Sequence, residues 1–262
     1  MGITKKIGKS LLLYILITSL LVTKNEITFT ISALIGLLFM FKYYKDIKID
    51  KVKPKIKTIF IYGLIIYGLT SFSNLISIEV NKLISLTGYS FTGENLSVFE
   101  FKNLYQTITM TIYAAIVAPI VEEFVFRGFI LETLKGFNTK LAIIISAFIF
   151  GLFHMEYFQL LPAIISGILL GILYVKNKSI WVPVGAHMIN NIISLILMYV
   201  NYDLTYIFII LSLLLLILEY KNLKIKDKKN NEFKYSYILK SLSCLTFIFI
   251  SILIIFLSFK AI

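Results

Sequence analysis

Arginine, histidine and cysteine are scarce in this chain of 262 residues. It contains one arginine, Arg127, two histidines and one cysteine, Cys244, although lysine occurs 25 times. A single cysteine excludes an intrachain disulfide and gives no information about the redox compartment. Because lysine is the ordinary cation of this chain, the single use of arginine indicates a position that needs a planar guanidinium.

A hydrophilic domain is also lacking, since 58% of the residues are hydrophobic and the mean hydropathy is +0.88. Only helices satisfy their own backbone in lipid at the observed spacing, and no segment alternates like a barrel strand. The sequence therefore predicts an all-α, polytopic transmembrane helix bundle of about eight or nine spans, with residues 1–262 forming a single integral-membrane domain. The apolar runs fall at about 10–23, 27–41, 58–80, 107–131, 141–158, 160–175, 180–200, 204–220 and 235–259.

The net charge of +12 comes from lysines that cluster in short tracts between the apolar runs. This pattern is typical of cytoplasmic loops that contact lipid headgroups, and it argues against a nucleic-acid partner. If the N-terminus is cytoplasmic and all nine runs span, 22 of the 26 basic residues lie on the cytoplasmic side. The bias toward Lys, Ile and Asn resembles that of AT-rich bacterial genomes. We therefore expect a multi-pass plasma-membrane protein of bacterial origin.

The segment VAPIVEEFVFRGFIL, residues 117–131, places Glu122, Glu123 and Arg127 among apolar neighbours. A charged side chain near the centre of a membrane helix costs about 2.5–3.5 kcal/mol, so the glutamates need partners. Glu123 and Arg127 are four residues apart, which is the spacing of an intrahelical ion pair. Glu122 points about 100° away from Glu123 on the helix. We therefore expect Glu123 to be structural and Glu122 to face a cavity.

Both histidines also fall in predicted spans. His154 ends the run AFIFGLFH, and His187 opens HMINN, in which Asn191 lies one helical turn further on. Counted from the cytoplasmic ends of their helices, Glu122, His154 and His187 lie roughly 14–21 Å deep at 1.5 Å per residue. The similar depth of these rare polar groups on three separate helices predicts that they share one site. The same spans contain three helix-kinking prolines: Pro119, Pro162 and Pro183.

Three motifs in this region carry a resemblance to a known family. EEFVFR fits EExxxR, FGLFH (150–154) fits FxxxH, and HMINN (187–191) fits HxxxN. In this order they resemble the CPBP family of intramembrane proteases, which includes type II CAAX prenyl endopeptidases and bacteriocin self-immunity proteins. The resemblance covers about residues 105–200, which would form the catalytic core. It implies that Glu122 and His154 activate a water, that His187 and Asn191 bind the oxyanion or orient the water, that Arg127 holds Glu123, and that Phe150 packs beside His154.

The resemblance leaves the cofactor open. Glu122, His154 and His187 are a common zinc set with water as the fourth ligand, so a divalent metal is one alternative. Activation of water by Glu122 and His154 without a metal uses the same residues, and it gives His187 and Asn191 an oxyanion role. On either alternative the expected function is a glutamate-dependent endopeptidase. It would cleave a membrane-associated peptide or protein at the cytoplasmic side, in bacteriocin immunity or membrane-peptide processing.

Other functions use similar residues. A transporter would also place Glu, His and Arg in mid-membrane, but the sequence shows no inverted repeats. A non-catalytic scaffold or immunity protein would use Glu123 and Arg127 as a structural pair and Asn191 as an interhelical hydrogen bond. The signatures of other intramembrane proteases are missing, because there is no HExxH, no GxGD partner for Asp203 and no glycine before Ser166.

Overall fold

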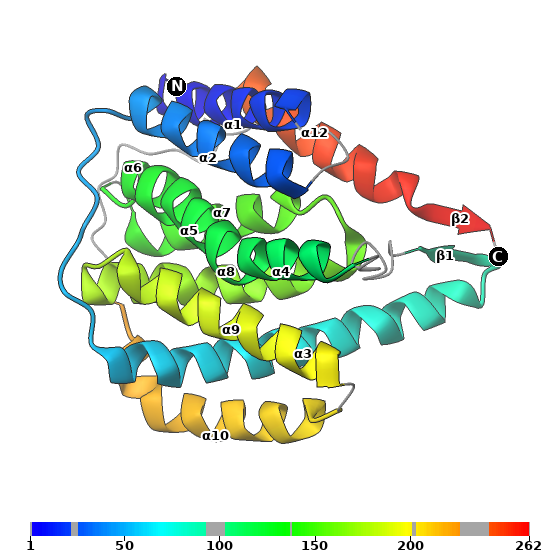
Figure 1. The fold of residues 1–262 in the computed structure, drawn as a ribbon. Coiled ribbons are helices and arrows are strands. Elements are labelled where there is room, and N and C mark those ends of the chain that lie inside the picture. Colours follow the sequence, from blue (N-terminus) through cyan, green and yellow to red (C-terminus); the bar gives the residue numbers. More distant parts are fainter. Residues whose placement is uncertain are drawn as a thin grey trace.

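The computed structural model describes residues 2–21, 26–92, 103–136, 138–200, 203–225 and 241–261, and these form a bundle of helices (Figure 1). The helices are α1 (Gly2–Leu21), α2 (Glu26–Tyr43), α3 (Ile56–Ser85), α7 (Thr139–Phe153), α8 (Tyr157–Asn177), α9 (Trp181–Val200), α10 (Thr205–Leu223) and α12 (Leu242–Leu257). A continuous helical segment between α3 and α7 consists of α4 (Leu104–Ile112), η2 (Tyr113–Val117), α5 (Ala118–Glu123), η3 (Phe124–Leu131) and α6 (Glu132–Leu134). The prediction of an all-α membrane bundle is confirmed.

Four of the described helices, α3, α8, α9 and α10, are long and apolar enough to cross a membrane. Helices α7 and α12 have 15 and 16 residues and therefore reach only about 23 Å, less than the ~30 Å hydrocarbon core. The predicted run 141–158 is not one helix. Helix α7 ends at Phe153 because Met155 adopts a left-handed conformation (φ 54°), and the Glu156 side chain then caps the start of α8. Residues 235–240 of the last predicted run lie outside the described residues.

The helices form layers, with α1, α2 and α12 on one side, the segment α4–α8 in the middle, and α3 with α9 and α10 on the other side (Figure 1). Close approach between layers depends on glycine. A Cβ at Gly68 of α3 would collide with the Phe208 carbonyl of α10, and a Cβ at Gly8 of α1 would collide with the backbone at Cys244 of α12. Small residues let membrane helices approach closely where side chains of ordinary size would hold them apart.

A GxxxG face packs α8 against α7, as the spacing of Gly167 and Gly171 predicts. A Cβ at Gly167 would lie 3.0 Å from Ala147, and a Cβ at Gly171 would lie 3.0 Å from Ile143, both in α7. This close contact fixes α8 against α7, the helix that carries Phe150 and ends just before His154.

Two short strands lie at one end of the bundle. β1 (Tyr89–Phe91) pairs antiparallel with β2 (Phe259–Ala261), with Ser90 opposite Lys260. The Phe91 ring stacks on Tyr157, at the start of α8, with ring centroids 4.1 Å apart. The strands therefore join the segment that follows α3 to the C-terminal end of the described chain, and Phe91 brings both against the start of α8.

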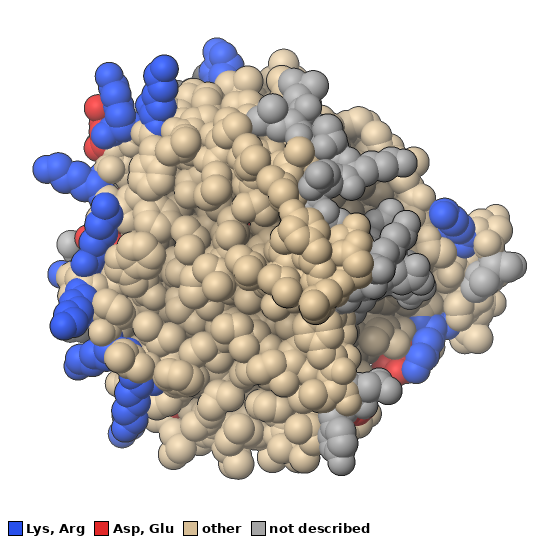
Figure 2. Space-filling model, viewed as in Figure 1, with Lys and Arg blue, Asp and Glu red and all other residues tan. Residues whose placement is uncertain are grey.

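Lysines gather at the opposite end of the bundle, which we call the lysine-rich end (Figures 1 and 2). Here α1 begins and α2, α6, α8 and α10 end. Among the 18 lysines in the described residues, 16 belong to segments at this end, and only Lys82 and Lys260 belong to the other. On the face that Figure 2 shows, the described residues between the two ends expose very few charged side chains, as expected where lipid surrounds the bundle. The remaining seven lysines, including five of those between 221 and 240, lie outside the described residues.

Candidate active site

The two adjacent glutamates lie at the end of α5, between two stretches of π-helix, η2 and η3. In η2 the Ala118 N–H bonds to the Tyr113 carbonyl, five residues back. Pro119 has no N–H, so it cannot donate to the Ala114 carbonyl, five residues before it. The Asn191 Nδ2 of α9 donates to that carbonyl instead, at 2.8 Å. The π-helical turn and the proline together leave the Ala114 carbonyl without a backbone donor, and the Asn191 side chain of α9 supplies one.

Glu123 and Arg127 form the predicted ion pair. Arg127 Nη1 lies 2.8 Å from Glu123 Oε1, and both side chains are 0% exposed. The guanidinium also donates from Nη2 to the Gly167 carbonyl at 3.2 Å and lies over the Phe150 ring, 4.5 Å from its centroid. A planar guanidinium donates both hydrogen bonds in its plane and packs against the ring with its face. An ammonium cannot do this, which explains the single use of arginine.

Glu123 has a second partner that the sequence did not indicate. Its Oε1 also contacts His187 Nδ1 at 2.9 Å. Because Glu123 is paired with Arg127 and accepts hydrogen bonds, the His187 proton lies on Nδ1, and Nε2 faces the other way. Nε2 is 3.8 Å from Glu122 Oε2. The adjacent carboxylates therefore contact the two nitrogens of one imidazole, and Glu123 orients that ring as well as holding Arg127.

Glu122 is the accessible carboxylate of the pair. Its side chain is 22% exposed, against 0% for Glu123 and 10% for His187. Tyr14 of α1 and Tyr113 of η2 lie within electrostatic reach of its charge. These two tyrosines are part of the surroundings of Glu122, and nothing in the sequence separates them from the other tyrosines. The exposure supports the expected division between an enclosed and an accessible glutamate.

His154 lies directly after the last residue of α7. Its Nδ1 is 2.9 Å from the Phe150 carbonyl and donates to it, so Nε2 carries the lone pair. The ring packs edge-on against Phe150 at 4.8 Å, and Phe150 in turn packs against His187 at 6.0 Å. The predicted contact between Phe150 and His154 is confirmed. Glu122 and His154 make no hydrogen bond to each other. They are linked indirectly, because Glu122 contacts His187, His187 packs against Phe150, and Phe150 packs against His154.

Asn191 contacts the helix that carries the glutamates. Besides its bond to Ala114, its Oδ1 accepts from Asn190 Nδ2 at 2.8 Å, and Asn190 Oδ1 accepts from the Thr70 hydroxyl of α3 at 3.1 Å. This series of amides links α3, α9 and η2. Asn191 thus makes the interhelical bond expected of a structural asparagine, while the second N–H of its amide is available for another acceptor.

The predicted metal ligands do not form a ligand cluster. Within the described residues, no group of three or more His, Cys, Asp and Glu side chains is placed to hold a metal ion. Nδ1 of His187 contacts Glu123, and Nδ1 of His154 contacts a carbonyl, so each histidine could offer only Nε2. The present arrangement of Glu122, His154 and His187 does not fit a three-ligand zinc site.

Comparisons with known proteins agree with the motifs. Residues 104–193 match the family model of type II CAAX prenyl endopeptidase Rce1-like proteins. The chain is also 40% identical over 83 residues to the "Putative membrane peptidase YdiL" of Bacillus subtilis (strain 168), a match that covers 31% of this chain. No solved structure matches the chain significantly. The resemblance to the CPBP proteases is therefore confirmed for this segment, and the chain is an integral membrane protein in which residues 104–193 are similar to this peptidase family.

The match with the bacterial relative spans 34% of that protein's length. The segment 104–193 contains every predicted site residue and nearly coincides with residues 105–200, where the motifs lie. Helices α1, α2, α3, α10 and α12 lie outside it, although Tyr14 of α1 reaches the surroundings of Glu122.

Proposed function

We propose that this protein is an intramembrane endopeptidase in which Glu122 is the general base. The observation that supports this most directly is the series Arg127–Glu123–His187–Glu122 within the segment that matches a peptidase family. Three of these groups hold one another in the interior, and the fourth is accessible. Such an arrangement fixes an imidazole and a carboxylate beside the position of a substrate.

In the proposed reaction Glu122 takes a proton from water, and the hydroxide oxygen attacks the carbonyl carbon of the peptide bond. His154 orients the water through the lone pair on Nε2. The negative charge that develops on the carbonyl oxygen is stabilised by His187, donating from Nε2 when protonated, and by the second N–H of Asn191. Glu122 then gives its proton to the leaving nitrogen as the C–N bond breaks.

Glu123 and Arg127 act through His187 in this proposal. Glu123 fixes the proton on Nδ1 and stabilises the imidazolium, in the way that a carboxylate orients the histidine of a catalytic triad. Arg127 neutralises Glu123, which is fully buried, and Phe150 packs against both histidines and the guanidinium. These three residues are positioning residues and do not contact the reacting atoms.

The substrate in this proposal is a peptide or protein with a membrane-associated segment. Glu122 lies 12 residues before the end of α6, so it is roughly 18 Å from the lysine-rich end. We place this end and the N-terminus in the cytoplasm by the positive-inside rule, in a bacterial plasma membrane. We further propose that the substrate reaches Glu122 from the cytoplasmic side. The cleavage would serve bacteriocin immunity or the processing of a small membrane peptide.

The test is cleavage of a library of membrane peptides by the purified, detergent-solubilised protein. Wild type is compared with Glu122→Gln and with Glu79→Gln, a control on a carboxylate that is 65% exposed in α3. We expect Glu122→Gln to lose at least ~100-fold of the rate, the size typical of a lost general base, and Glu79→Gln to retain it. Equal cleavage by all three proteins would refute the role of Glu122.

A strong chelator in the same assay decides between the two chemistries. If no metal takes part, the rate of peptide cleavage should be the same with and without the chelator, because Glu122 and His154 activate the water. Loss of activity with the chelator and its recovery with zinc would refute that proposal and establish the metal alternative. Absence of cleavage by correctly folded wild type across the library would favour a non-catalytic scaffold.

A further inference from the structure

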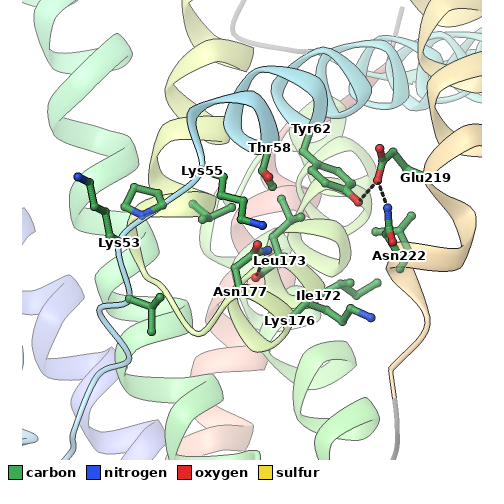
Figure 3. Close-up of a pocket in the computed structure, with 14 residues that line it drawn as sticks. Lys53, Lys55, Thr58, Tyr62, Ile172, Leu173, Lys176, Asn177, Glu219 and Asn222 are labelled. Carbon is green, nitrogen blue, oxygen red and sulfur yellow. Dashed lines mark hydrogen bonds between the residues drawn. The ribbon is translucent and has the colours of Figure 1, made fainter.

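A cavity of about 360 Å³ lies at the lysine-rich end, between the start of α3, the end of α8 and the end of α10 (Figure 3). It shares no residue with the candidate active site. Its lining combines cationic, polar and apolar side chains, which distinguishes it from the lipid-facing surface around it.

Three lysines line this cavity. Lys55 extends over it toward Asn177, Lys53 lies at its edge, and Lys176 lies on the other side (Figure 3). Lys176 donates to the Lys224 carbonyl at 2.8 Å, which leaves two of its N–H groups for other acceptors. In the described part of the chain, none of the three lysines forms an ion pair with a carboxylate. The cavity therefore has positive charge without a local counter-charge on its ammonium groups.

One carboxylate, Glu219, also lines the cavity, but it has partners of its own. Its Oε2 accepts from the Tyr62 hydroxyl at 3.0 Å and from Asn222 Nδ2 at 2.7 Å (Figure 3). Three lysines against one carboxylate leave an excess of two positive charges in the lining. Glu219 already has hydrogen-bond donors of its own, so the lysine ammonium groups are the ones left to bind an anion.

The wall that carries Lys53 and Lys55 is fixed to the rest of the bundle. The Val52 N–H donates to the Lys178 carbonyl and the Ile180 N–H donates to the Asp50 carbonyl, both at 2.9 Å. These bonds hold the connection between α2 and α3 along the turn between α8 and α9. Lys53 and Lys55 therefore line the cavity from a backbone that is held by hydrogen bonds, so less entropy is lost when an anion binds.

Apolar side chains complete the cavity and favour a lipid over a soluble anion. Leu173 of α8 and Leu223 of α10 line it together with the lysines. Ile56 and Phe60 on the same first turns of α3 are 70% and 58% exposed, as expected of side chains that contact acyl chains. Basic pockets between membrane helices at the headgroup level are typical sites for anionic lipids.

We propose that this cavity binds the phosphate group of an anionic phospholipid, with Lys53, Lys55 and Lys176 as its cationic ligands. The glycerol backbone and acyl chains then leave along the apolar side of the cavity. The site is independent of the peptidase proposal, because no residue of the Glu122 region takes part.

The test is native mass spectrometry of the full-length protein in detergent, with dioleoylphosphatidylglycerol and dioleoylphosphatidylcholine as probes. The triple variant Lys53→Gln/Lys55→Gln/Lys176→Gln is compared with Lys5→Gln/Lys9→Gln/Lys140→Gln, which removes the same charge from exposed positions at the same end. We expect about tenfold or greater weakening of phosphatidylglycerol binding in the first variant and little change in the second. Equal weakening in both variants, or no preference of wild type for phosphatidylglycerol, would overturn the proposal.

Two further measurements, on a Glu219 variant and on competition by inorganic phosphate, test the same assignment. Glu219→Gln removes the one negative charge of the lining, so it should tighten phosphatidylglycerol binding several-fold, a gain that damage to the fold would not produce. Lack of any gain would contradict the assignment of the lipid to this cavity. Inorganic phosphate alone should not compete at millimolar concentration, and efficient competition would assign the cavity to a soluble anion instead.

Discussion

The interior site and the lysine-rich end accommodate positive charge in different ways. In the interior a single guanidinium, that of Arg127, is fully enclosed and has a carboxylate, a carbonyl and an aromatic ring as partners. At the lysine-rich end 16 lysines of the described residues are spread over helix ends and connections, most of them at the surface (Figure 2). A buried charge needs specific partners, whereas a surface charge is satisfied by water and headgroups. Substitutions should therefore have large effects in the first region and small, pH- or salt-dependent effects in the second.

The largest effect is expected at Arg127. Arg127→Met leaves the Glu123 carboxylate buried without its cation, which should destabilise the protein by about 3–5 kcal/mol. The matched control is Lys82→Met, which removes the cation of an exposed i,i+3 pair with Glu79 and should cost less than about 1 kcal/mol. Thermal unfolding of both variants in the same detergent measures the difference. If both variants lose a similar amount of unfolding free energy, burial does not determine how much an ion pair stabilises this protein.

An intermediate effect is expected at Asn191. Asn191→Ala removes the donor to the Ala114 carbonyl and should cost about 1–2 kcal/mol of unfolding free energy. Pro119→Ala restores an N–H near that carbonyl, so the loss from Asn191→Ala should be smaller in the Pro119→Ala background. A double-mutant cycle on thermal unfolding tests this coupling. Strict additivity would show that the proline and the asparagine act independently.

The smallest effect is expected at Lys135, on the lysine-rich end, whose ammonium contacts Asp50 at 2.8 Å and Glu132 at 2.7 Å. Burial alone would lower the pKa of Lys135, but the hydrogen bonds to these carboxylates outweigh it and raise the pKa. A group whose pKa is raised on folding contributes its stability at low and neutral pH and loses it as the pH rises through the folded pKa. Lys135→Met should therefore cost only about 1 kcal/mol or less at neutral pH, because the group is partly exposed.

The difference between wild type and Lys135→Met should shrink as the pH rises above ~10, where the free lysine loses its proton. Lys140→Met, at an exposed position in the same region, serves as the control for the loss of one lysine charge. A difference that is the same at pH 7 and pH 11 would argue against the contribution of the charge.

The sequence predicted the parts of the site that depend on local spacing. The pair Glu123–Arg127 follows from four residues on one helix, and Phe150 and His154 are likewise four apart. The contact of Glu123 with His187 could not be predicted, because it depends on the rotation of α9 against α5, which packing of distant residues decides. The end of α7 at Phe153 was also missed, since an apolar run does not show that Met155 turns left-handed.

The π-helical turns on either side of Glu122 and Glu123 have a consequence for how such a site can change. A π-turn holds about one residue more than an α-turn, so it absorbs an insertion without breaking the helix. Removing one residue from η2 would turn the glutamates by roughly 100° relative to α4 while both parts stay helical. Loss of a single codon can therefore re-aim two acidic side chains without a new helix, loop or partner.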